Sequence, residues 1–308
     1  MDYNLLRKQK YKIVGEHSGV KLCHWMRQKL FYGRACYKEK FYGINTHRCI
    51  QMTPTVDICN QCCLFCWRIH SFGEEIEKWD SAEYILEKCI QAQREIISGF
   101  KGDERCNLQL WNEAREPNQI AISLAGEPTF YPYLDELIES AKKKGMRTFL
   151  VTNGTKPEVI EEMENLPTQL YVSITAPNEE IYKKLCLPRE KDGWKKILAT
   201  LSLLESLNSK TRVVIRNTLV DGWNIGYEEQ YAKLIERAQP LFIEPKGYMF
   251  VGHSRLHLSL KNMPSHKKVL EFGKKLAELT GYNFIDEKED SRVVLLCKKS
   301  YSPQIPLQ

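Results

Sequence analysis

Long hydrophobic segments are missing from this sequence. No apolar run approaches the roughly 18 residues that a membrane-spanning helix needs, and the start, MDYNLLRKQKYKIVGEHSG, has no apolar segment of the signal-peptide type. Low-complexity tracts, internal repeats and flexible linkers are also absent. Hydrophobic residues make up 43% of the 308 residues and charged residues 27%, a composition typical of a chain with a folded core. We therefore expect a cytoplasmic protein that does not interact with a membrane.

A glycine-rich dinucleotide-binding motif is missing as well. Apolar, β-rich runs predict strands at 120–124, 148–152, 170–174, 213–220 and 241–243. Amphipathic patterns predict helices between and after them, at 133–144, 158–165, 179–185, 194–207 and 228–238. Because no GxGxxG follows the first strand, the alternation favours a (β/α) barrel or partial barrel over a Rossmann sheet. Functional residues then belong at the carboxyl ends of the strands.

The predicted barrel has an extension at each end of the chain. We assign residues 1–50 to a basic N-terminal extension, 51–255 to the barrel and 256–308 to a small C-terminal extension, which contains a predicted helix at 264–280 and a strand at 291–297. We expect these three regions to form one continuous globular unit.

Charge is distributed unevenly. The chain has a net charge of +6, yet its first 50 residues contain eleven lysines and arginines against three acidic residues, a net charge of +8. The other 258 residues therefore carry −2. This asymmetry indicates a polyanionic partner, although a solvated basic face explains it equally well.

The cysteines indicate metal rather than disulfides, since their number, 11, is odd and the expected compartment is reducing. Four of them lie in the segment CNQCCLFC, at Cys59, Cys62, Cys63 and Cys66. Two zinc knuckles, Cys59/Cys62 and Cys63/Cys66, are one possible ligand set, but a loop normally separates such pairs and none does here. The other set is Cys59, Cys63 and Cys66 around a [4Fe-4S] cluster with one open iron, which leaves Cys62 as a spacer.

A second cysteine trio lies upstream. Twelve residues separate Cys23 from Cys36, and twelve separate Cys36 from Cys49. The equal spacing predicts a second [4Fe-4S] site with an open iron, against the alternative of unrelated buried cysteines. Four further cysteines have no ligand spacing and are predicted to be structural: Cys89, Cys106, Cys186 and Cys297.

The cluster loop resembles that of radical SAM enzymes, whose open iron binds S-adenosylmethionine (SAM). A Gly126-Glu127-Pro128-Thr129 turn after the predicted strand at 120–124 is similar to their SAM-binding turn. Together with the second trio, four segments resemble the short archaeal form of the 4-demethylwyosine synthases: CYKEKFYGINTHRCIQ from Cys36, FCWR ending at Arg68, AISLAGEPTFYPYLDELI from Ala121, and EPKGYMFVGHSR from Glu244.

This resemblance implies a radical SAM (β/α) partial TIM barrel with an N-terminal iron-sulfur extension and a small C-terminal extension. The implied activity is that of a carbon-carbon bond-forming lyase in wyosine biosynthesis. It condenses pyruvate with N1-methylguanosine beside the anticodon of phenylalanine tRNA, closing the third ring of the tricyclic base. Two [4Fe-4S] clusters and SAM are the implied cofactors, with Cys59, Cys63 and Cys66 holding the SAM cluster and Cys23, Cys36 and Cys49 the second.

The resemblance also implies roles for individual residues. Lys38 is the expected Schiff-base lysine for pyruvate, with Lys40 as the alternative. The expected SAM contacts are Gly126, Glu127, Asn153, Ser173, Thr175 and Arg216, with Asn217, Tyr248 and Met249 as further positions. For tRNA we expect phosphate contacts from Arg27, Lys29 and Arg34, base stacking on Tyr32, Tyr37, Phe41 and Tyr42, and further contacts from Arg255 and His257.

Other functions remain open at this point. One alternative is a different two-cluster radical SAM enzyme, such as a molybdopterin-precursor cyclase or a tRNA methylthiotransferase. The cyclase pattern needs a C-terminal cysteine trio, and Cys297 is the only cysteine after Cys186. A zinc-dependent RNA-binding protein is another. A flavodoxin-like domain of roughly 150 residues does not fit before the cysteine-bearing barrel, so we expect an external electron donor of the flavodoxin or ferredoxin type.

Overall fold

The computed structural model describes residues 3–68, 76–299 and 301–305. Within these residues ten strands form one sheet in the order β1-β2-β3-β4-β5-β6-β7-β8-β10-β9. The six central strands are parallel. They are β3 (Cys49–Thr53), β4 (Gln119–Ile122), β5 (Arg147–Thr152), β6 (Gln169–Ser173), β7 (Arg212–Leu219) and β8 (Phe242–Gly247).

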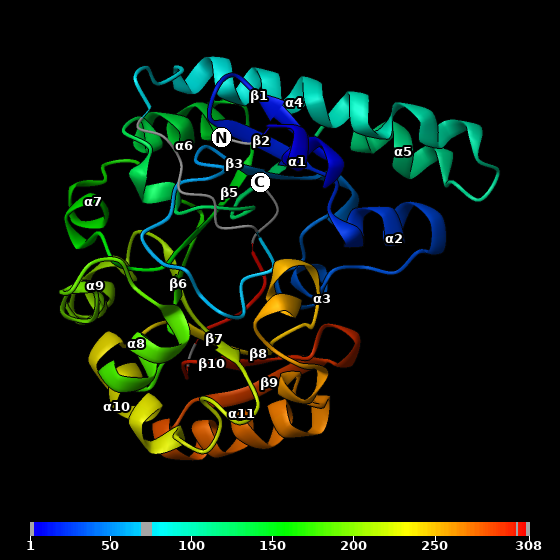
Figure 1. Cartoon of the computed structure of the whole chain (residues 1–308). Helices are drawn as coiled ribbons and strands as arrows, with labels where there is room; N and C mark the ends of the chain where they lie inside the picture. The colour runs from blue at the N-terminus through cyan, green and yellow to red at the C-terminus, as the bar shows by residue number, and fades with distance from the viewer. Residues whose placement is uncertain (1–2, 69–75, 300, 306–308) are drawn as a thin grey trace.

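Helices cover the outer face of the parallel strands, which curve around a common centre without closing (Figure 1). These helices are α4 (Ala82–Ile97), α6 (Leu134–Lys143), α7 (Pro157–Glu162), α8 (Glu179–Cys186), α9 (Gly193–Leu207), α10 (Glu228–Ala238) and α11 (His266–Thr280). The prediction of a partial (β/α) barrel is therefore confirmed.

Alternation along the strands separates two apolar cores. In β7, Val213 and Ile215 pack with the outer helices, whereas Val214 faces the barrel interior. This two-residue period is what a strand buried on both faces requires. The interior core also contains Phe149 and Tyr171, and it is completed by side chains from outside the parallel strands.

Both extensions contribute strands to the same sheet. The N-terminal hairpin of β1 (Tyr11–Val14) and β2 (Ser18–Lys21) pairs antiparallel with β3. At the other edge β10 (Val293–Cys297) pairs antiparallel with β8 and with β9 (Asn283–Lys288). The extensions and the barrel thus share one hydrogen-bonded sheet.

Short helices occupy the rest of the N-terminal segment: α1 (Tyr3–Lys8), α2 (His24–Tyr32), α3 (Tyr37–Tyr42) and the 3-10 turn η1 (Thr46–Arg48). Gly33 and Gly43 end α2 and α3 in the left-handed conformation, with φ of 69° and 71°. Helix α3 fills the barrel interior with Tyr37, Phe41 and Tyr42. Helices α2 and α5 (Leu108–Ala114) project to one side over a separate small core (Figure 1).

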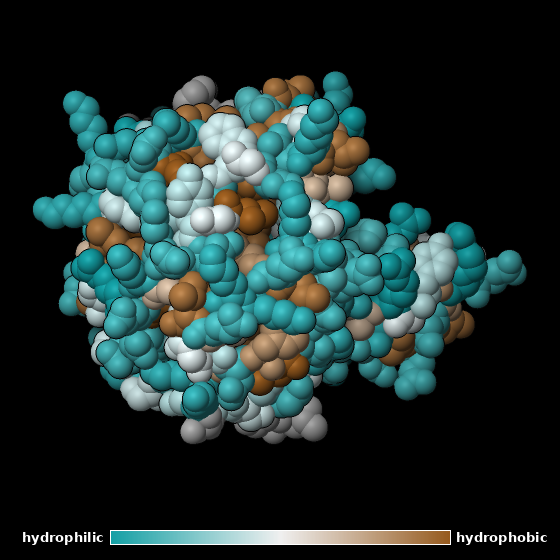
Figure 2. Space-filling view, turned by 90° about the horizontal axis from the view of Figure 1, so that it is seen from below, coloured by the Kyte–Doolittle hydropathy of each residue, from teal (hydrophilic) through white to brown (hydrophobic). Residues whose placement is uncertain are grey.

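The surface over α10 and α11 is mainly hydrophilic, with hydrophobic residues scattered across it (Figure 2). Among the described residues, no helix combines the length and the apolar character required to cross a membrane.

Candidate active site

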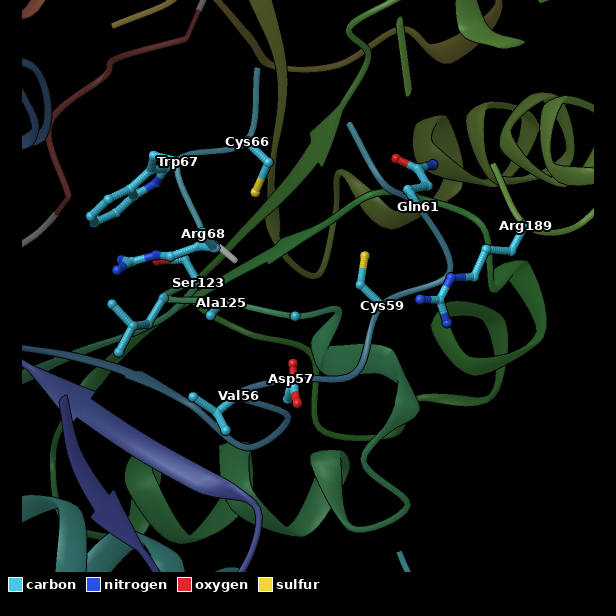
Figure 3. A pocket seen from close by; sticks show the side chains of 12 residues that line it. Val56, Asp57, Cys59, Gln61, Cys66, Trp67, Arg68, Ser123, Ala125 and Arg189 are labelled. Carbon is cyan, nitrogen blue, oxygen red and sulfur yellow. The ribbon is translucent and has the colours of Figure 1, made fainter. Parts of the chain in front are cut away.

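The CNQCCLFC segment forms a loop beyond the carboxyl end of β3, where the barrel places functional residues. Burial, then the neighbouring Cys63 thiol, raises the pKa of Cys66 to about 12. Burial also raises the pKa of Cys59, with further contributions from Cys63 and Cys66. The three thiols therefore lie within electrostatic range of one another. Figure 3 shows Cys59 and Cys66 directing their sulfur atoms into one cavity from two sides.

A three-thiol set is the donor set of a [4Fe-4S] cluster that keeps one iron open. Each thiolate binds a different iron, so the sulfurs need not converge on one point. In the described part of the chain, no three histidine, cysteine or acidic side chains are arranged to hold a single metal ion. Three thiols within electrostatic range of one another are a donor set compatible with such a cluster, although the Cys63 thiol donates to the Gln61 side-chain oxygen at 3.3 Å in this structure.

Gly126 brings the turn after β4 against this loop. Its φ is +65°, and a Cβ at this position would overlap the carbonyl oxygens of Thr55 and Ile58. The backbone N–H of Glu127 donates to the Ile58 carbonyl at 2.7 Å. Only glycine permits so close an approach of two backbones.

The cavity between the loop and the turn has a volume of about 150 Å³. Among the residues expected to contact SAM, Gly126 lines it; Glu127, Asn153, Ser173, Thr175 and Arg216 do not. Polar residues without an expected role also line it: Asp57, Gln61, Arg68, Ser123 and Arg189 (Figure 3). Arg68 lies two residues after Cys66, at the end of the FCWR sequence, and this closeness is a sequence signal for its position. Arg189 has no such signal.

The Glu127 carboxylate is buried and bonded within the protein. It accepts hydrogen bonds from the Thr152 hydroxyl at 2.6 Å, the Asn153 backbone N–H at 2.7 Å and the Thr129 hydroxyl at 2.7 Å. Burial raises its pKa. Glu127 therefore ties the turn to the end of β5. Asn153 reaches the cluster loop from there, because its side-chain nitrogen donates to the Asn60 side chain at 2.9 Å and lies 4.0 Å from Cys59 Sγ.

The second cysteine trio lies at the amino end of β3, away from the carboxyl ends at which we expect barrel sites. Cys23 and Cys36 precede the first turns of α2 and α3, and Cys49 begins β3. Burial and then Cys23 raise the pKa of both Cys36 and Cys49 to about 12. Each twelve-residue spacer forms a helix and a turn, and this brings the next cysteine of the trio back to the one before it.

Lys38 lies in the first turn of α3 and is 8% exposed. Its Nζ is 4.5 Å from the ring centroids of both Phe149 and Tyr171, inside the barrel. Burial, followed by the charge of Arg216, lowers its pKa. Lys40, the alternative, points to the surface and forms an ion pair with Asp286 at 2.7 Å.

A buried carboxylate, Glu244, organises the groups around Lys38. It accepts hydrogen bonds from the hydroxyls of Tyr42 at 2.6 Å, Tyr171 at 3.1 Å and Tyr37 at 3.2 Å. Arg216 forms an ion pair with it at 3.1 Å. Arg216 is thus directed toward the surroundings of Lys38. Sequence reasoning assigned Glu244 no role, although a Glu-Pro-Lys triplet inside the apolar run LFIEPKG was a signal.

The residues expected to bind tRNA differ in accessibility. Arg27 and Arg34 are exposed, whereas Lys29 is partly buried. Lys29 pairs with Glu39 at 2.7 Å, and Arg34 pairs with Asp290 at 3.2 Å. Tyr32 is 55% exposed. The prediction that Tyr37, Phe41 and Tyr42 stack on bases is wrong, because all three are buried in the barrel interior. Arg255 and His257 are exposed beyond β8.

Two protein-family models match the chain. The model described as the radical SAM superfamily matches residues 53–235, and the model described as Wyosine base formation matches residues 237–298. The second segment contains Glu244 and the strands β8, β9 and β10.

Three known proteins illustrate the similarity. The S-adenosyl-L-methionine-dependent tRNA 4-demethylwyosine synthase of Pyrococcus abyssi is 51% identical, with 98% of this chain and 90% of the relative covered. The enzyme of the same name from Methanocaldococcus jannaschii is 45% identical over 96% and 94% of the two chains. A solved structure of TYW1 with a lysine-pyruvate adduct bound superposes with a TM-score of 0.90 at 44% identity and covers 98% of both chains. From this identity over nearly the full length, we conclude that the chain belongs to the S-adenosyl-L-methionine-dependent tRNA 4-demethylwyosine synthase family.

Proposed function

We propose that this chain is a tRNA 4-demethylwyosine synthase that condenses pyruvate with N1-methylguanosine beside the anticodon of phenylalanine tRNA. The observation that carries the proposal is the position of Lys38. A buried lysine lies between two aromatic rings in the barrel interior, two residues after a cysteine of the second trio, in a chain similar to a TYW1 with a lysine-pyruvate adduct.

Cys59, Cys63 and Cys66 are proposed to hold the [4Fe-4S] cluster that works with SAM. When bound, the cluster and SAM supply the 5′-deoxyadenosyl radical that abstracts hydrogen from the N-methyl group. The chain's own task is to position SAM against the loop. The Gly126 turn and the cavity beside Cys59 and Cys66 support this role, and Glu127 and Asn153 fix the turn and the loop. Ser173 and Thr175, at the end of β6, remain proposed SAM contacts.

Cys23, Cys36 and Cys49 are proposed to hold a second [4Fe-4S] cluster next to Lys38. The Lys38 amine attacks the ketone carbon of pyruvate, and water leaves as the imine forms. Burial favours the neutral amine that this attack requires. The rings of Phe149 and Tyr171 orient the amine and limit the access of water to the imine.

The proposal includes three partners. They are phenylalanine tRNA, pyruvate and an external electron donor of the flavodoxin or ferredoxin type, all in the cytoplasm. Arg27 is an exposed proposed phosphate contact, while Lys29 and Arg34 must exchange their ion pairs for phosphates.

The function is tested by Lys38→Ala, with Lys40→Ala as the matched control on the same helix. We expect Lys38→Ala to retain iron, bind tRNA and release 5′-deoxyadenosine, yet to form no tricyclic base. Borohydride with labelled pyruvate is expected to mark Lys38 in the wild type and in Lys40→Ala. Product formation by Lys38→Ala at the wild-type rate would contradict the imine, and label on Lys40 would shift the assignment by two residues.

The cluster assignment is tested by iron and sulfide counts after anaerobic reconstitution. Two cubane clusters predict about eight irons per chain, and replacement of either cysteine trio by alanine is expected to halve that number. Only the Cys59/Cys63/Cys66 variant is expected to lose reductive SAM cleavage. Cys62→Ala, within the same loop, serves as the control and is expected to keep both properties. SAM cleavage by the triple variant would refute this ligand set.

A further inference from the structure

Lys246 is a second lysine in the barrel interior with no role in the proposal above. It lies on β8 two residues after Glu244 and therefore faces the same side of the strand. Its Nζ donates to the Ser291 carbonyl at 2.7 Å and lies 5.1 Å from the Tyr37 ring centroid. Burial lowers its pKa to about 8. Among the described residues, no carboxylate forms an ion pair with it.

The carboxylates near Lys246 are bonded to other groups, and the remaining acidic group in its electrostatic range is the Cys36 thiol. Glu244 is the buried carboxylate of this region, but three tyrosine hydroxyls and Arg216 already bond to it. Asp290, the next acidic group in electrostatic range of Lys246, is bonded to Arg34 and Lys288. Lys246 is partly buried and its Nζ donates to a neutral carbonyl, so its ammonium keeps the capacity to donate to a bound anion.

Lys246 and Lys38 approach the same neighbours. Both lie within electrostatic range of the Cys36 thiol. Tyr37 connects them, because its ring contacts Lys246 while its backbone precedes Lys38 in α3. In pyruvate the carboxylate is bonded directly to the ketone carbon, so an anion anchor must lie next to the lysine that forms the imine.

We infer that Lys246 binds the carboxylate of pyruvate through a charge-assisted hydrogen bond and so selects an α-keto acid over an uncharged ketone. The inference rests on the proposed imine at Lys38 and adds the residue that recognises the substrate. Lys246 makes and breaks no covalent bond in this role, since it holds the carboxylate while Lys38 attacks the adjacent carbon.

The test compares borohydride trapping of pyruvate and of pyruvamide, an uncharged ketone of nearly the same size, by the reconstituted protein. Lys246→Met removes the charge and keeps the length of the side chain, and Lys246→Arg restores the charge. Lys288→Met is the matched control. Lys288 lies on β9 of the adjoining hairpin, pairs with Asp290 and places its Nζ over the ring of Trp25 on α2. Iron content and thermal midpoint are recorded for each variant.

We expect Lys246→Met to raise the pyruvate concentration for half-maximal labelling about tenfold or more, the effect of losing one charge-assisted hydrogen bond. Labelling by pyruvamide is expected to stay unchanged. Lys246→Arg is expected to recover most of the preference for pyruvate, and Lys288→Met is expected to behave as the wild type.

Other outcomes overturn the inference. Unchanged pyruvate labelling in Lys246→Met would show that the carboxylate is bound elsewhere. An equal loss of pyruvate and pyruvamide labelling would show that Lys246 has only a structural role, through its hydrogen bond to the Ser291 carbonyl. Absence of labelling in the wild type would instead refute the imine at Lys38, and this inference with it.

Discussion

Two lysines that are two positions apart on α3 have opposite environments. Because a helix turns by about 100° per residue, Lys38 and Lys40 lie on opposite faces. Lys38 faces the barrel interior, whereas Lys40 pairs with Asp286 at the surface. The phase of a short helix therefore decides which amine is desolvated, and desolvation is what makes a lysine nucleophilic at neutral pH.

Gly126→Ala is expected to abolish reductive SAM cleavage and to destabilise the protein by about 3 kcal/mol or more, since the added Cβ combines a left-handed backbone with overlap of two carbonyl oxygens. The measurements are 5′-deoxyadenosine release and the thermal midpoint of the reconstituted variant.

Gly145→Ala is the control for backbone conformation alone. Gly145 has a φ of +70°, close to the +65° of Gly126, but nothing lies within 4 Å of a Cβ built there. We expect a loss of only about 1 kcal/mol and normal SAM cleavage. Similar effects of the two substitutions would mean that the contact with the cluster loop is unimportant.

The cysteines of the second trio and the edge strands of the sheet both belong to short elements. The β1–β2 hairpin is joined to residues before and after the cysteine loop through His17, which is fully buried. Its Nδ1 bonds to the Pro54 carbonyl at 2.6 Å, and its Nε2 accepts the Asp80 backbone N–H at 3.0 Å. This pair of contacts requires the neutral ring, because Nε2 must present a lone pair.

Stability is expected to fall with acid through His17. Burial lowers the pKa of His17 in the folded protein from its ordinary 6.5, so below pH 6.5 the unfolded chain binds a proton that the folded chain does not. The stabilisation is complete above pH 6.5 and declines, by at most about 1.4 kcal/mol per pH unit, as pH falls toward the lower folded value.

Thermal midpoints of the reconstituted protein between pH 7.5 and pH 5.5 measure this slope. His17→Asn is expected to lower the midpoint at neutral pH and to flatten the pH dependence. His24→Asn, at an exposed position beginning α2, is expected to retain the wild-type slope. An unchanged slope in His17→Asn would assign the acid sensitivity to other groups.

At the scale of the whole molecule, the basic N-terminal segment is partly neutralised by distant acidic residues. Arg34 pairs with Asp290 and Lys40 with Asp286, which links the first 50 residues to the C-terminal hairpin. The net positive charge of the segment therefore overstates the cations that are free to meet phosphates. Exposed ion pairs of this kind contribute little stability, so an incoming phosphate can replace them.

Replacing Arg27, Lys29 and Arg34 with glutamine is expected to weaken tRNA binding and to reduce the slope of log affinity against log salt by about 1 to 2. Each phosphate contact contributes about 0.7–0.9 to that slope, and two of the three cations already have protein partners. Affinities at several salt concentrations measure the change.

A charge-matched control replaces Lys183, Lys184 and Lys267 on α8 and α11, which lie away from α2 (Figure 1). This variant loses the same net charge and is expected to bind tRNA as the wild type does. Equal effects of the two triple variants would indicate a general charge effect instead of a binding surface on α2.

The sequence by itself determined the alternation of strands and helices. The hydrophobic period and the apolar runs that predict them are local properties, which can be identified within each segment without the rest of the chain. Element ends moved by one or two residues in most cases, but β8 extends to Gly247, beyond the predicted 243, since Glu244 and Lys246 are stabilised inside a polar interior that the apolar pattern does not reveal. Helix α4 and the N-terminal hairpin were not predicted. Cysteine spacing also indicated the proposed cluster loop, because its three proposed ligands are neighbours in the chain.

Tertiary structure alone decided which groups share the barrel interior. Glu244 lies more than 200 residues from Tyr42, yet the two are hydrogen-bonded. The same packing buries Tyr37, Phe41 and Tyr42, which the sequence suggested as base-stacking residues, and directs Arg216 toward Lys38. The physical reason is that local pattern reports the face of an element on which a residue lies, whereas burial, pKa and ion pairing depend on what the rest of the chain places against that face.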